Sequence, residues 1–499
     1  MEYISTRNNY KKVDSAAAIS LGMVPEGGLF VPKQITEFTT EKIMSMKNKN
    51  YQELAVWIFK EFLSDFTEEE IEESVAEAYK SDSFPVEEKT PLVKLNDNTY
   101  ILELWHGPTA AFKDMALQIL PQLLLKSVEK LEIKNEIVIL VATSGDTGKA
   151  ALEGFKDLEG VKIIVFYPED GVSRVQEDQM KTTTGNNTAV VSLKGNFDDC
   201  QTAVKDIFAD KDFKAKMENN NYQFSSANSI NWGRLLPQIV YYFKAYFDTI
   251  KQNGIKAGEK INITVPTGNF GNILAGYYAY KMGLPVNKFI CASNDNKVLT
   301  DFFKTGVYDI ERDFIKTISP SMDILISSNL ERFLFEMTDH DSEKICNWYQ
   351  ELKQNNKFKI DQRTKEKIQN LFSGHYCTET EAKAQIKSTY DKFSYLLDPH
   401  TAVAVNSINK YRKQNHDLKT AVITSTANPY KFSRAVLESL KGEKSSKDEY
   451  RIIEELEELT AVEIHRGIKG LENKQSLHDH SSNKDYLKEK IAEILELNK

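Results

Sequence analysis

Short apolar segments alternate with amphipathic ones through the middle of the chain. Three of them are rich in β-branched residues, and each is followed by a polar Gly/Ser/Thr/Asn loop and then by helical spacing: Ile137–Ala142, Ile261–Val265 and Thr420–Thr424. Two more, Lys162–Phe166 and Phe289–Ala292, come after the first two of these helices. Continuously apolar strands that alternate with helices are typical of parallel sheets covered on both faces. The pattern therefore predicts an α/β fold.

Helical regions flank this core. The segments Tyr51–Leu63 and Thr67–Tyr79 have their apolar residues at helical spacing, which predicts a helical N-terminal cap. The stretch from about 301 to 395 is charged and helix-rich, and an amphipathic, charged tail begins at Lys441. We expect the following regions: the cap at 1–94, a first α/β domain at 95–255, and a second α/β domain at 256–499 that contains the helical insertion at about 301–395 and the helical tail.

The composition narrows the class of protein. The 499 residues are 41% hydrophobic and 27% charged, as in a globular protein, and the formal net charge of −9 argues against a nucleic-acid-binding surface. Met1–Arg7 lacks the apolar core of a signal peptide, and no apolar run approaches the roughly 18 residues of a membrane span. The four cysteines are scattered, with no C-x-x-C pattern. We therefore expect a cytoplasmic protein with reduced thiols, no metal site, and no nucleic-acid or membrane partner.

The first strand ends in the loop Thr143–Gly148, where a helix begins. Its glycines allow a tight turn with inward N–H groups, and a helix N-terminus attracts anions. Ser144, Asp146 and Thr147 are also ordinary capping residues, so capping of the helix alone would explain them. A Walker loop is excluded because two residues, rather than four, separate the glycines.

A second loop repeats this design after the strand Ile261–Val265. It consists of Gly268, Asn269, Phe270, Gly271 and Asn272. The spacing is not G-x-G-x-x-G, so a dinucleotide is not indicated, whereas a short nest of N–H groups suits a single phosphate. Ligands of parallel sheets bind outside the carboxyl ends of the strands. We therefore expect the two loops and the one after Thr424 to build one crevice.

Lys113 lies between a predicted strand, Thr99–Leu104, and a predicted apolar helix, Met115–Leu125. Partial burial at such a boundary would lower the pKa of its amine and make it nucleophilic. The alternative is an ordinary surface lysine whose stem covers apolar neighbours. Spacing and polarity do not decide between the two.

Sequence blocks that follow one another in a fixed order along most of the chain resemble those of a known family. This resemblance favours the nucleophilic role of Lys113 over the surface lysine. The blocks are Tyr3–Thr6, Pro25–Pro32, His106–Thr109 with Phe112–Asp114, Thr143–Gly148, Gly195–Asp199, Asn228–Asn231 with Arg234 and Gln238, Pro266–Asn272, Ser319–Asp323, Asp398–His400, and Thr426–Pro429 with Lys431–Phe432. In this order they resemble the threonine synthases, which are fold-type II pyridoxal-phosphate enzymes. The resemblance implies two doubly wound α/β domains with the helical cap.

The resemblance also implies roles for the residues of the crevice. Lys113 would carry pyridoxal 5'-phosphate on its amine and act as the catalytic base. The cofactor phosphate would bind Gly268, Asn269, Phe270, Gly271 and Asn272, and the hydroxyl of Thr426 would face the pyridine nitrogen. Groups for the substrate, O-phosphohomoserine, would come from three places: Ser144, Gly145, Asp146 and Thr147 for its carboxylate, the Asn228 and Ser229 block, and Arg234 for its phosphate.

The implied reaction converts O-phosphohomoserine and water to L-threonine and phosphate, in a monomer or a homodimer. Other reactions on the same fold stay open: a phospho-lyase, a threonine or serine dehydratase, or an inactive relative that serves as a binding module. Two places depart from the family pattern. Asn428 stands where many relatives have His, and Ser173–Arg174 matches no fixed role.

Overall fold

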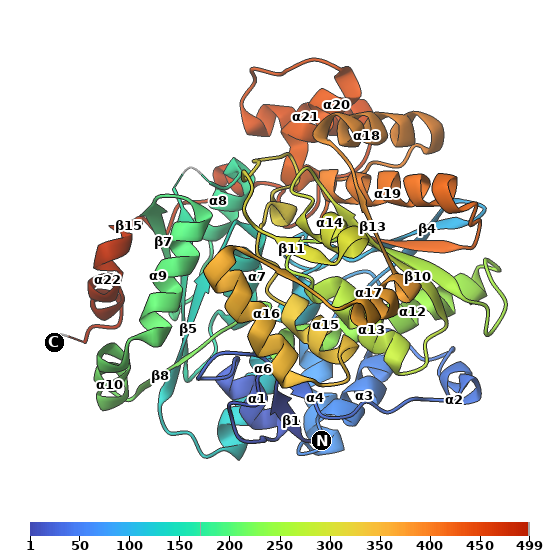
Figure 1. The fold of residues 1–499 in the computed structure, drawn as a ribbon. Helices are drawn as coiled ribbons and strands as arrows, with labels where there is room; N and C mark the ends of the chain where they lie inside the picture. The colour runs from blue at the N-terminus through green and yellow to red at the C-terminus, as the bar shows by residue number, and fades with distance from the viewer. Residues whose placement is uncertain (170, 498–499) are drawn as a thin grey trace.

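The chain folds around two mainly parallel sheets that are covered by helices, in the computed structural model that describes residues 1–169 and 171–497 (Figure 1). The helices in chain order are α1 (Ser15–Leu21), α2 (Thr40–Ser45), α3 (Tyr51–Phe62), α4 (Glu68–Ala78), α5 (Asp114–Leu117), α6 (Leu120–Lys130), α7 (Asp146–Phe155), α8 (Arg174–Lys181), α9 (Phe197–Ala209), α10 (Lys211–Asn219), α11 (Trp232–Leu235), α12 (Pro237–Lys251), α13 (Gly271–Lys281), α14 (Val298–Thr305), α15 (Leu330–Met337), α16 (Ser342–Asn355), α17 (Gln362–Leu371), α18 (Glu379–Phe393), α19 (Pro399–Asn415), α20 (Ser433–Lys441), α21 (Glu449–Thr460) and α22 (Leu487–Ile494). The predicted α/β fold is confirmed.

The smaller sheet has five strands in the order β15-β7-β6-β5-β8, and all its neighbours are parallel. Its strands are β5 (Glu136–Ala142), β6 (Val161–Pro168), β7 (Thr188–Lys194), β8 (Tyr222–Ser225) and β15 (His480–Asn483). The two central strands, β5 and β6, are almost wholly buried because helices cover both faces, which is why their sequences are continuously apolar.

The larger sheet has six strands in the order β13-β10-β9-β14-β4-β3. Its strands are β3 (Leu92–Asn96), β4 (Thr99–Glu103), β9 (Ile261–Pro266), β10 (Val286–Ser293), β13 (Phe372–Tyr376) and β14 (Ala421–Ser425). All neighbours are parallel except β3, which pairs antiparallel with β4 at the edge. The carboxyl ends of β9 and β14 therefore lie together.

The N-terminal cap is helical, as predicted. Capping boxes begin α3 at Asn50 and α4 at Thr67, where each N-cap side chain and a glutamate three residues later satisfy each other's backbone N–H. The apolar face of α3 packs on α12, and α1 packs on α6. The buried residues of these helices belong to one hydrophobic core that also includes one face of the smaller sheet and α12. The cap is thus part of the main core rather than a separate unit.

The sheets divide the chain differently from the expected bounds. Strand β4 was expected in the region 95–255, but it pairs with β14 in the larger sheet. The predicted helix Met115–Leu125 is two helices, α5 and α6, because Pro121 lies in the first turn of α6 and cannot continue a helix from before. These differences place Lys113 on a connection between the two sheets.

Four strands occur where only helices were expected: β11 (Val307–Asp309) and β12 (Lys357–Lys359), which pair antiparallel with each other, and two that extend the main sheets. Strand β13 lies inside the predicted helical insertion, and β15 lies in the predicted helical tail, where it pairs with the edge strand β7. Neither has an apolar run: β13 reads Phe-Ser-Gly-His-Tyr and β15 reads His-Ser-Ser-Asn. Both form by pairing with the edge of an existing sheet, which the local pattern does not reveal.

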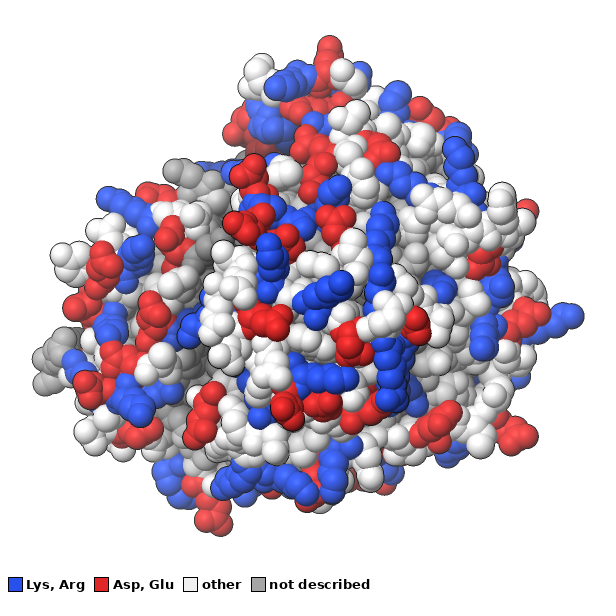
Figure 2. All heavy atoms as spheres, viewed as in Figure 1, with Lys and Arg blue, Asp and Glu red and all other residues white. Residues whose placement is uncertain are grey.

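The surface carries charges of both signs. On the face that Figure 2 shows, Lys and Arg are interspersed with Asp and Glu, without a large region of one sign. Among residues 1–169 and 171–497, no helix has the length and apolar character needed to cross a membrane.

Candidate active site

A cavity of about 930 Å³ lies at the carboxyl ends of β5, β9 and β14. Most of the residues singled out from the sequence line it, and they are Lys113, Ser144, Thr147, Asn228, Ser229, Arg234, Gly268, Asn269, Phe270, Gly271, Asn272 and Thr426. Gly145 and Asp146 do not line it. The expected crevice is therefore present, and it collects residues from six segments of the chain.

Lys113 is the N-cap residue of α5, and its side chain is 11% exposed. Burial lowers the pKa of its amine, the negative charge of Asp146 opposes that shift, and Lys431 and Arg234 add to it. The loop that carries Lys113 is bound to the loop after β14, because Phe112 N donates to Thr426 O at 2.8 Å and Ala111 forms a bridge with Ala427. This pairing fixes the backbone of the Lys113 loop beside that of Thr426, whose hydroxyl has no protein partner among the described residues.

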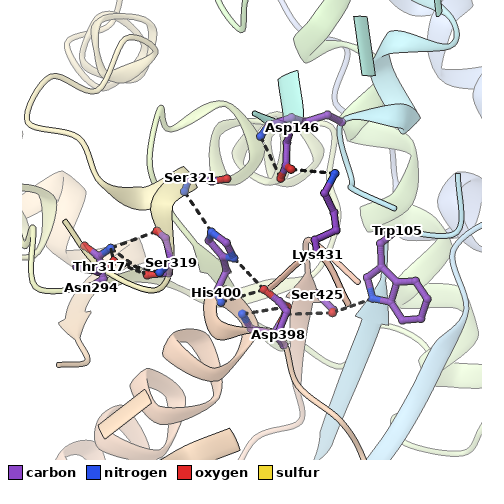
Figure 3. Close-up of polar contacts among 12 residues, drawn as sticks. Trp105, Asp146, Asn294, Thr317, Ser319, Ser321, Asp398, His400, Ser425 and Lys431 are labelled. Atoms are coloured by element: carbon purple, nitrogen blue, oxygen red, sulfur yellow. Dashed lines mark hydrogen bonds and ion pairs between the residues drawn. The ribbon is translucent and has the colours of Figure 1, made fainter. Parts of the chain in front are cut away.

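Asp146 faces two lysines rather than the cavity. Its Oδ1 lies 2.9 Å from Lys431 Nζ, and its Oδ2 lies 3.6 Å from Lys113 Nζ, as Figure 3 shows for the first pair. Burial opposes ionisation of this carboxyl, but the charges of Lys431 and Lys113 outweigh burial and hold its pKa well below the ordinary value. Asp146 therefore sets the charge around Lys113, and its carboxylate is directed at the two lysines rather than into the cavity.

The rest of the loop Thr143–Gly148 is also largely engaged within the protein. Thr143 Oγ1 accepts from Gly145 N at 3.0 Å and from Gly148 N at 2.8 Å. Gly145 has φ of 124° and lies against Gln176, so a Cβ at this position would be 2.4 Å from Gln176 Cδ. Ser144 and Thr147 remain as the groups of this loop that line the cavity.

The loop Gly268–Asn272 presents its backbone to the cavity. Phe270 has φ of 65°, and its ring packs against Phe333 in the core, so the backbone and not the ring faces inward. The loop is held from outside: Ser327 Oγ donates to Gly268 O at 2.7 Å and Asn329 N donates to Asn269 O at 3.1 Å. A Cβ at Gly268 would lie 2.5 Å from Ser321 O, so only glycine fits there. Helix α13 begins at Gly271, and its free N–H groups suit an anion.

Arg234 is 3% exposed and lines the cavity from α11. Its Nη1 donates to Ala227 O at 2.5 Å, whereas its Nε has no partner among the described residues. Burial lowers the pKa of the guanidinium to about 10, so it is still a cation at neutral pH. Ser229 lies close by, with its Oγ 3.3 Å from Ser328 Oγ. A buried cation with an unpaired N–H is suited to hold a phosphate.

The structure adds residues whose roles the sequence did not indicate. Lys431 and Gln176 both bind Asp146, with Gln176 Nε2 at 2.8 Å from Oδ1. Gln176 is held by a capping box with Ser173, which explains the stretch Ser173–Arg174. Asn428 is also a capping residue, since its side chain accepts from Tyr430 N. In the sequence, Lys431 stands out only as part of the block Lys431–Phe432 that carries the family resemblance, and no local pattern marks Gln176.

His400 is a second addition. Figure 3 shows it between Ser321 and Asp398: Ser321 N donates to Nε2 at 3.2 Å, and Nδ1 lies 2.9 Å from Asp398 Oδ1. Because Nε2 accepts, the proton of the neutral ring is on Nδ1 and is donated to Asp398. The segment of Ser321 covers Gly268, so His400 supports the wall behind the glycine loop.

The residues present fit pyridoxal phosphate. The cavity holds one buried lysine amine with a lowered pKa, a glycine loop at a helix start for a phosphate, and the open hydroxyl of Thr426. The buried Asn272 Nδ2, within that loop, has no partner among the described residues, and the same is true of Arg234 Nε. Within the part of the chain that the structure describes, no cluster of three or more His, Cys, Asp or Glu side chains is suited to a metal ion.

Three family models match the chain. Residues 2–79 match "Threonine synthase N terminus", residues 84–364 match "Pyridoxal-phosphate dependent enzyme", and residues 401–478 match "Threonine synthase, C-terminal". Together they span the cap, both sheets and most of the C-terminal region.

Curated relatives agree with these matches. The chain is 37% identical over 489 residues to the threonine synthase of Saccharomyces cerevisiae, which covers 92% of this chain and 93% of that one. It is 41% identical over 457 residues to threonine synthase-like 1 of Pongo abelii. That match covers 88% of this chain but only 61% of the relative, so the chain spans about three fifths of the length of that protein.

Solved structures agree as well. The crystal structure of pyridoxal-phosphate-bound threonine synthase from Brucella melitensis superposes with a TM-score of 0.87 at 34% identity, and that of yeast threonine synthase with 0.88 at 34% identity. Each comparison covers 99% of both chains. The chain belongs to the threonine synthase family of pyridoxal-phosphate-dependent enzymes.

Proposed function

We propose that the protein converts O-phosphohomoserine and water to L-threonine and phosphate. One observation carries the proposal: a single cavity combines the buried amine of Lys113 with two separate groups of anion donors, the loop Gly268–Asn272 and Arg234. A phosphorylated cofactor and a phosphorylated substrate need two such sites at once. The activity named for the yeast and Pseudomonas aeruginosa relatives, at 37% identity each, supports the same reaction.

The cofactor would be held by three groups of this chain. Lys113 would bind its aldehyde carbon, Gly268–Asn272 its phosphate, and the Thr426 hydroxyl its pyridine nitrogen. When bound, pyridoxal phosphate supplies an electron sink next to the α-carbon of an amino acid. A hydroxyl partner does not hold the pyridine nitrogen protonated as a carboxylate would, so Thr426 moderates that sink.

Lys113 would move protons once the substrate amine has displaced it. A proton acceptor must be neutral when free, and burial of the Lys113 amine favours its neutral form. Asp146 counteracts part of this effect, so the ion pair of Asp146 with Lys431 tunes the basicity of Lys113. The amine then accepts the proton of the substrate α-carbon and returns protons in later steps.

Arg234 would hold the phosphate of the substrate, and Ser144 and Thr147 would face its carboxylate from the start of α7. Asn228 and Ser229 complete the wall beside Arg234. In the overall reaction, the β-carbon loses a proton and gains the hydroxyl of water, while the γ-carbon loses phosphate and gains a proton. Holding the leaving phosphate by a buried cation stabilises the negative charge that develops on it.

Incubation of the purified protein with pyridoxal phosphate and O-phosphohomoserine tests the proposal. We expect threonine and inorganic phosphate in equal amounts. Phosphate with an oxo acid and ammonia in place of threonine would indicate a phospho-lyase, and turnover of serine or threonine would indicate a dehydratase. Lys113→Ala is the control that should form no product. A cytoplasmic location and a monomeric or homodimeric state stay predictions.

A further inference from the structure

Two neighbouring tyrosines of α12 bind one asparagine of the glycine loop. Tyr241 Oη lies 2.7 Å from Asn272 Oδ1, and Tyr242 Oη lies 2.5 Å from the same oxygen and 3.0 Å from the Asn272 carbonyl. Asn272 is in the first turn of α13, is 8% exposed and lines the cavity. Its side-chain nitrogen, also buried, has no partner among the described residues.

The distances decide which way the Asn272 amide is turned. The contacts of 2.5 and 2.7 Å lie within the range of O–H···O bonds and at or below the short limit of N–H···O bonds. The amide oxygen therefore faces the tyrosines, and the nitrogen is the atom left without a partner. A buried N–H group is rarely left unpaired in a native protein. The missing partner must be an acceptor.

Both tyrosines are suited to act as donors. Each is at most 1% exposed, and burial raises the pKa of both hydroxyls well above the ordinary value, so the protons stay on them. The Tyr242 ring lies close against α13, where a Cβ at Gly276 would be 3.1 Å from its Cζ. Tyr241 has one hydroxyl proton, and the shorter contact, 2.7 Å to Asn272 Oδ1 against 3.1 Å to Gln238 Oε1, assigns that proton to Asn272.

We propose that Tyr241 and Tyr242 are positioning residues that turn the Asn272 amide so that its nitrogen donates to the phosphate of the cofactor. This inference rests on the proposal that Gly268–Asn272 holds that phosphate. The tyrosines do not touch the cofactor: they act through Asn272. If the two hydroxyls merely fastened α12 to α13, their loss would affect stability but not the recognition of a phosphate.

Titration with pyridoxal 5'-phosphate and with pyridoxal separates these roles. The full chain is stripped of cofactor, and the dissociation constant of each compound is measured by absorbance. Free pyridoxal partly closes on its own 5'-hydroxyl, which the phosphorylated compound cannot do, so the ratio is compared between wild type and variants, where this contribution cancels. In Tyr241→Phe/Tyr242→Phe we expect the preference for the phosphorylated compound to fall about tenfold, the scale of one hydrogen bond to a charged group. Single variants should lose about threefold each by the same reasoning, and they serve if the double variant does not fold.

Tyr246→Phe is the matched control. Tyr246 lies on the same helix and is fully buried; its hydroxyl donates to Glu259 O and accepts from Gly258 N, away from the cavity. Its removal should lower the melting temperature without changing the preference. In an Asn272→Ala background the tyrosine changes should have no further effect on the preference, because the group through which they act is gone.

The outcomes distinguish this inference from the proposal beneath it. A wild-type protein that binds both compounds equally would show that the loop does not hold a phosphate, which would contradict this inference and also the proposed role of Gly268–Asn272. A wild-type protein that prefers the phosphorylated compound, with a preference unchanged in the tyrosine variants, overturns the role of Tyr241 and Tyr242 alone. A loss that persists in the Asn272→Ala background would also overturn it.

Discussion

The loops that follow β5 and β9 look alike in sequence but are used differently. Both combine two glycines with small polar residues where a helix begins, and both were expected to bind anions. In the loop Gly268–Asn272, the backbone faces the cavity and neighbours hold the loop from outside. In the loop Thr143–Gly148, Thr143 takes two of the N–H groups and the carboxylate of Asp146 binds lysines.

The difference comes from one acidic residue. A carboxylate within an anion nest would repel an anion unless a cation neutralises it, and Lys431 and Lys113 do so here. In the proposed function, the first loop adjusts the charge around Lys113, and Ser144 and Thr147 are the groups of this loop that face the substrate. The second loop has no ionisable side chain, so its donors remain available to a phosphate. Glycine spacing alone does not distinguish these uses.

Among the changes that test this difference between the two loops, Asp146→Asn should have the largest effect, which is a loss of stability. It leaves the buried Lys431 without its carboxylate, which typically costs about 3–5 kcal/mol of stability. Because the folded-state pKa of Asp146 is depressed, the stability that it contributes is present above the ordinary carboxyl pKa and is lost as the pH falls towards its folded value. The free energy of unfolding measured against pH checks both points. A variant as stable as the wild type would contradict the assigned pairing.

The same variant should change the pH dependence of catalysis. The charge of Asp146 raises the pKa of Lys113, so its removal lowers that pKa further, and the acid limb of the kcat profile should move to lower pH. Asp248→Asn is the control, since Asp248 pairs with Lys244 on α12 outside the cavity lining. Its profile should not move. An unchanged profile in Asp146→Asn would leave the first loop without its proposed effect on Lys113.

Gly268→Ala should weaken the binding of the cofactor by the second loop, Gly268–Asn272. The added Cβ would lie 2.5 Å from Ser321 O, and relief of such a contact costs about 2 kcal/mol, which is about thirtyfold in cofactor affinity. Gly442→Ala, with open space around the added carbon, should leave the affinity unchanged. Titration with pyridoxal phosphate measures both. Equal affinities for the two variants would mean that the loop does not contact the cofactor.

Arg234→Lys tests whether the phosphate of the substrate has its own site apart from both loops. Lysine keeps the charge but loses the Nε–H, so KM for O-phosphohomoserine should rise about tenfold with a smaller change in kcat. Arg412→Lys is a matched control, because Arg412 is half-buried and binds Thr99 Oγ1 and Asn98 O at the opposite end of β4. If the KM values of both variants matched the wild type, Arg234 would have no role in binding phosphate.

Thr426→Val should have the smallest effect. It removes the hydroxyl and keeps the shape, so kcat should fall about fivefold, as for the loss of one neutral hydrogen bond of about 1 kcal/mol. Cofactor affinity should change little, since the phosphate loop is intact. Steady-state kinetics and titration measure the two quantities. A fall in affinity as large as that of Gly268→Ala would show that the two positions do not act separately.

Much of the fold follows from the apolar pattern. Strands β5, β6, β9, β10 and β14 are largely buried, so each contains an apolar run that the sequence reveals. Strands β13 and β15 were not visible, because edge pairing with β10 and β7, rather than their own side chains, makes them strands. The position of β4 in the larger sheet depends on contacts across more than 300 residues of chain, which no local pattern encodes.

Only part of the site can be predicted from the sequence. Lys113 and the loop Gly268–Asn272 came from family blocks together with loop chemistry, and both line the cavity. The pairing of Asp146 with Lys431 could not be predicted, because the two residues are far apart in sequence and each has an ordinary role elsewhere. The same holds for Tyr241 and Tyr242, which read as apolar residues of a buried helix until their hydroxyls are seen at Asn272.

Borohydride reduction of the purified protein with pyridoxal phosphate tests the central claim most directly. Reduction fixes a pyridoxyl group on the lysine that binds the cofactor, and peptide mapping identifies that lysine. We expect the label on Lys113 alone, with no label on the neighbouring Lys431, whose ammonium is bound to Asp146. A label on any other lysine, or none at all, would contradict the assignment of Lys113.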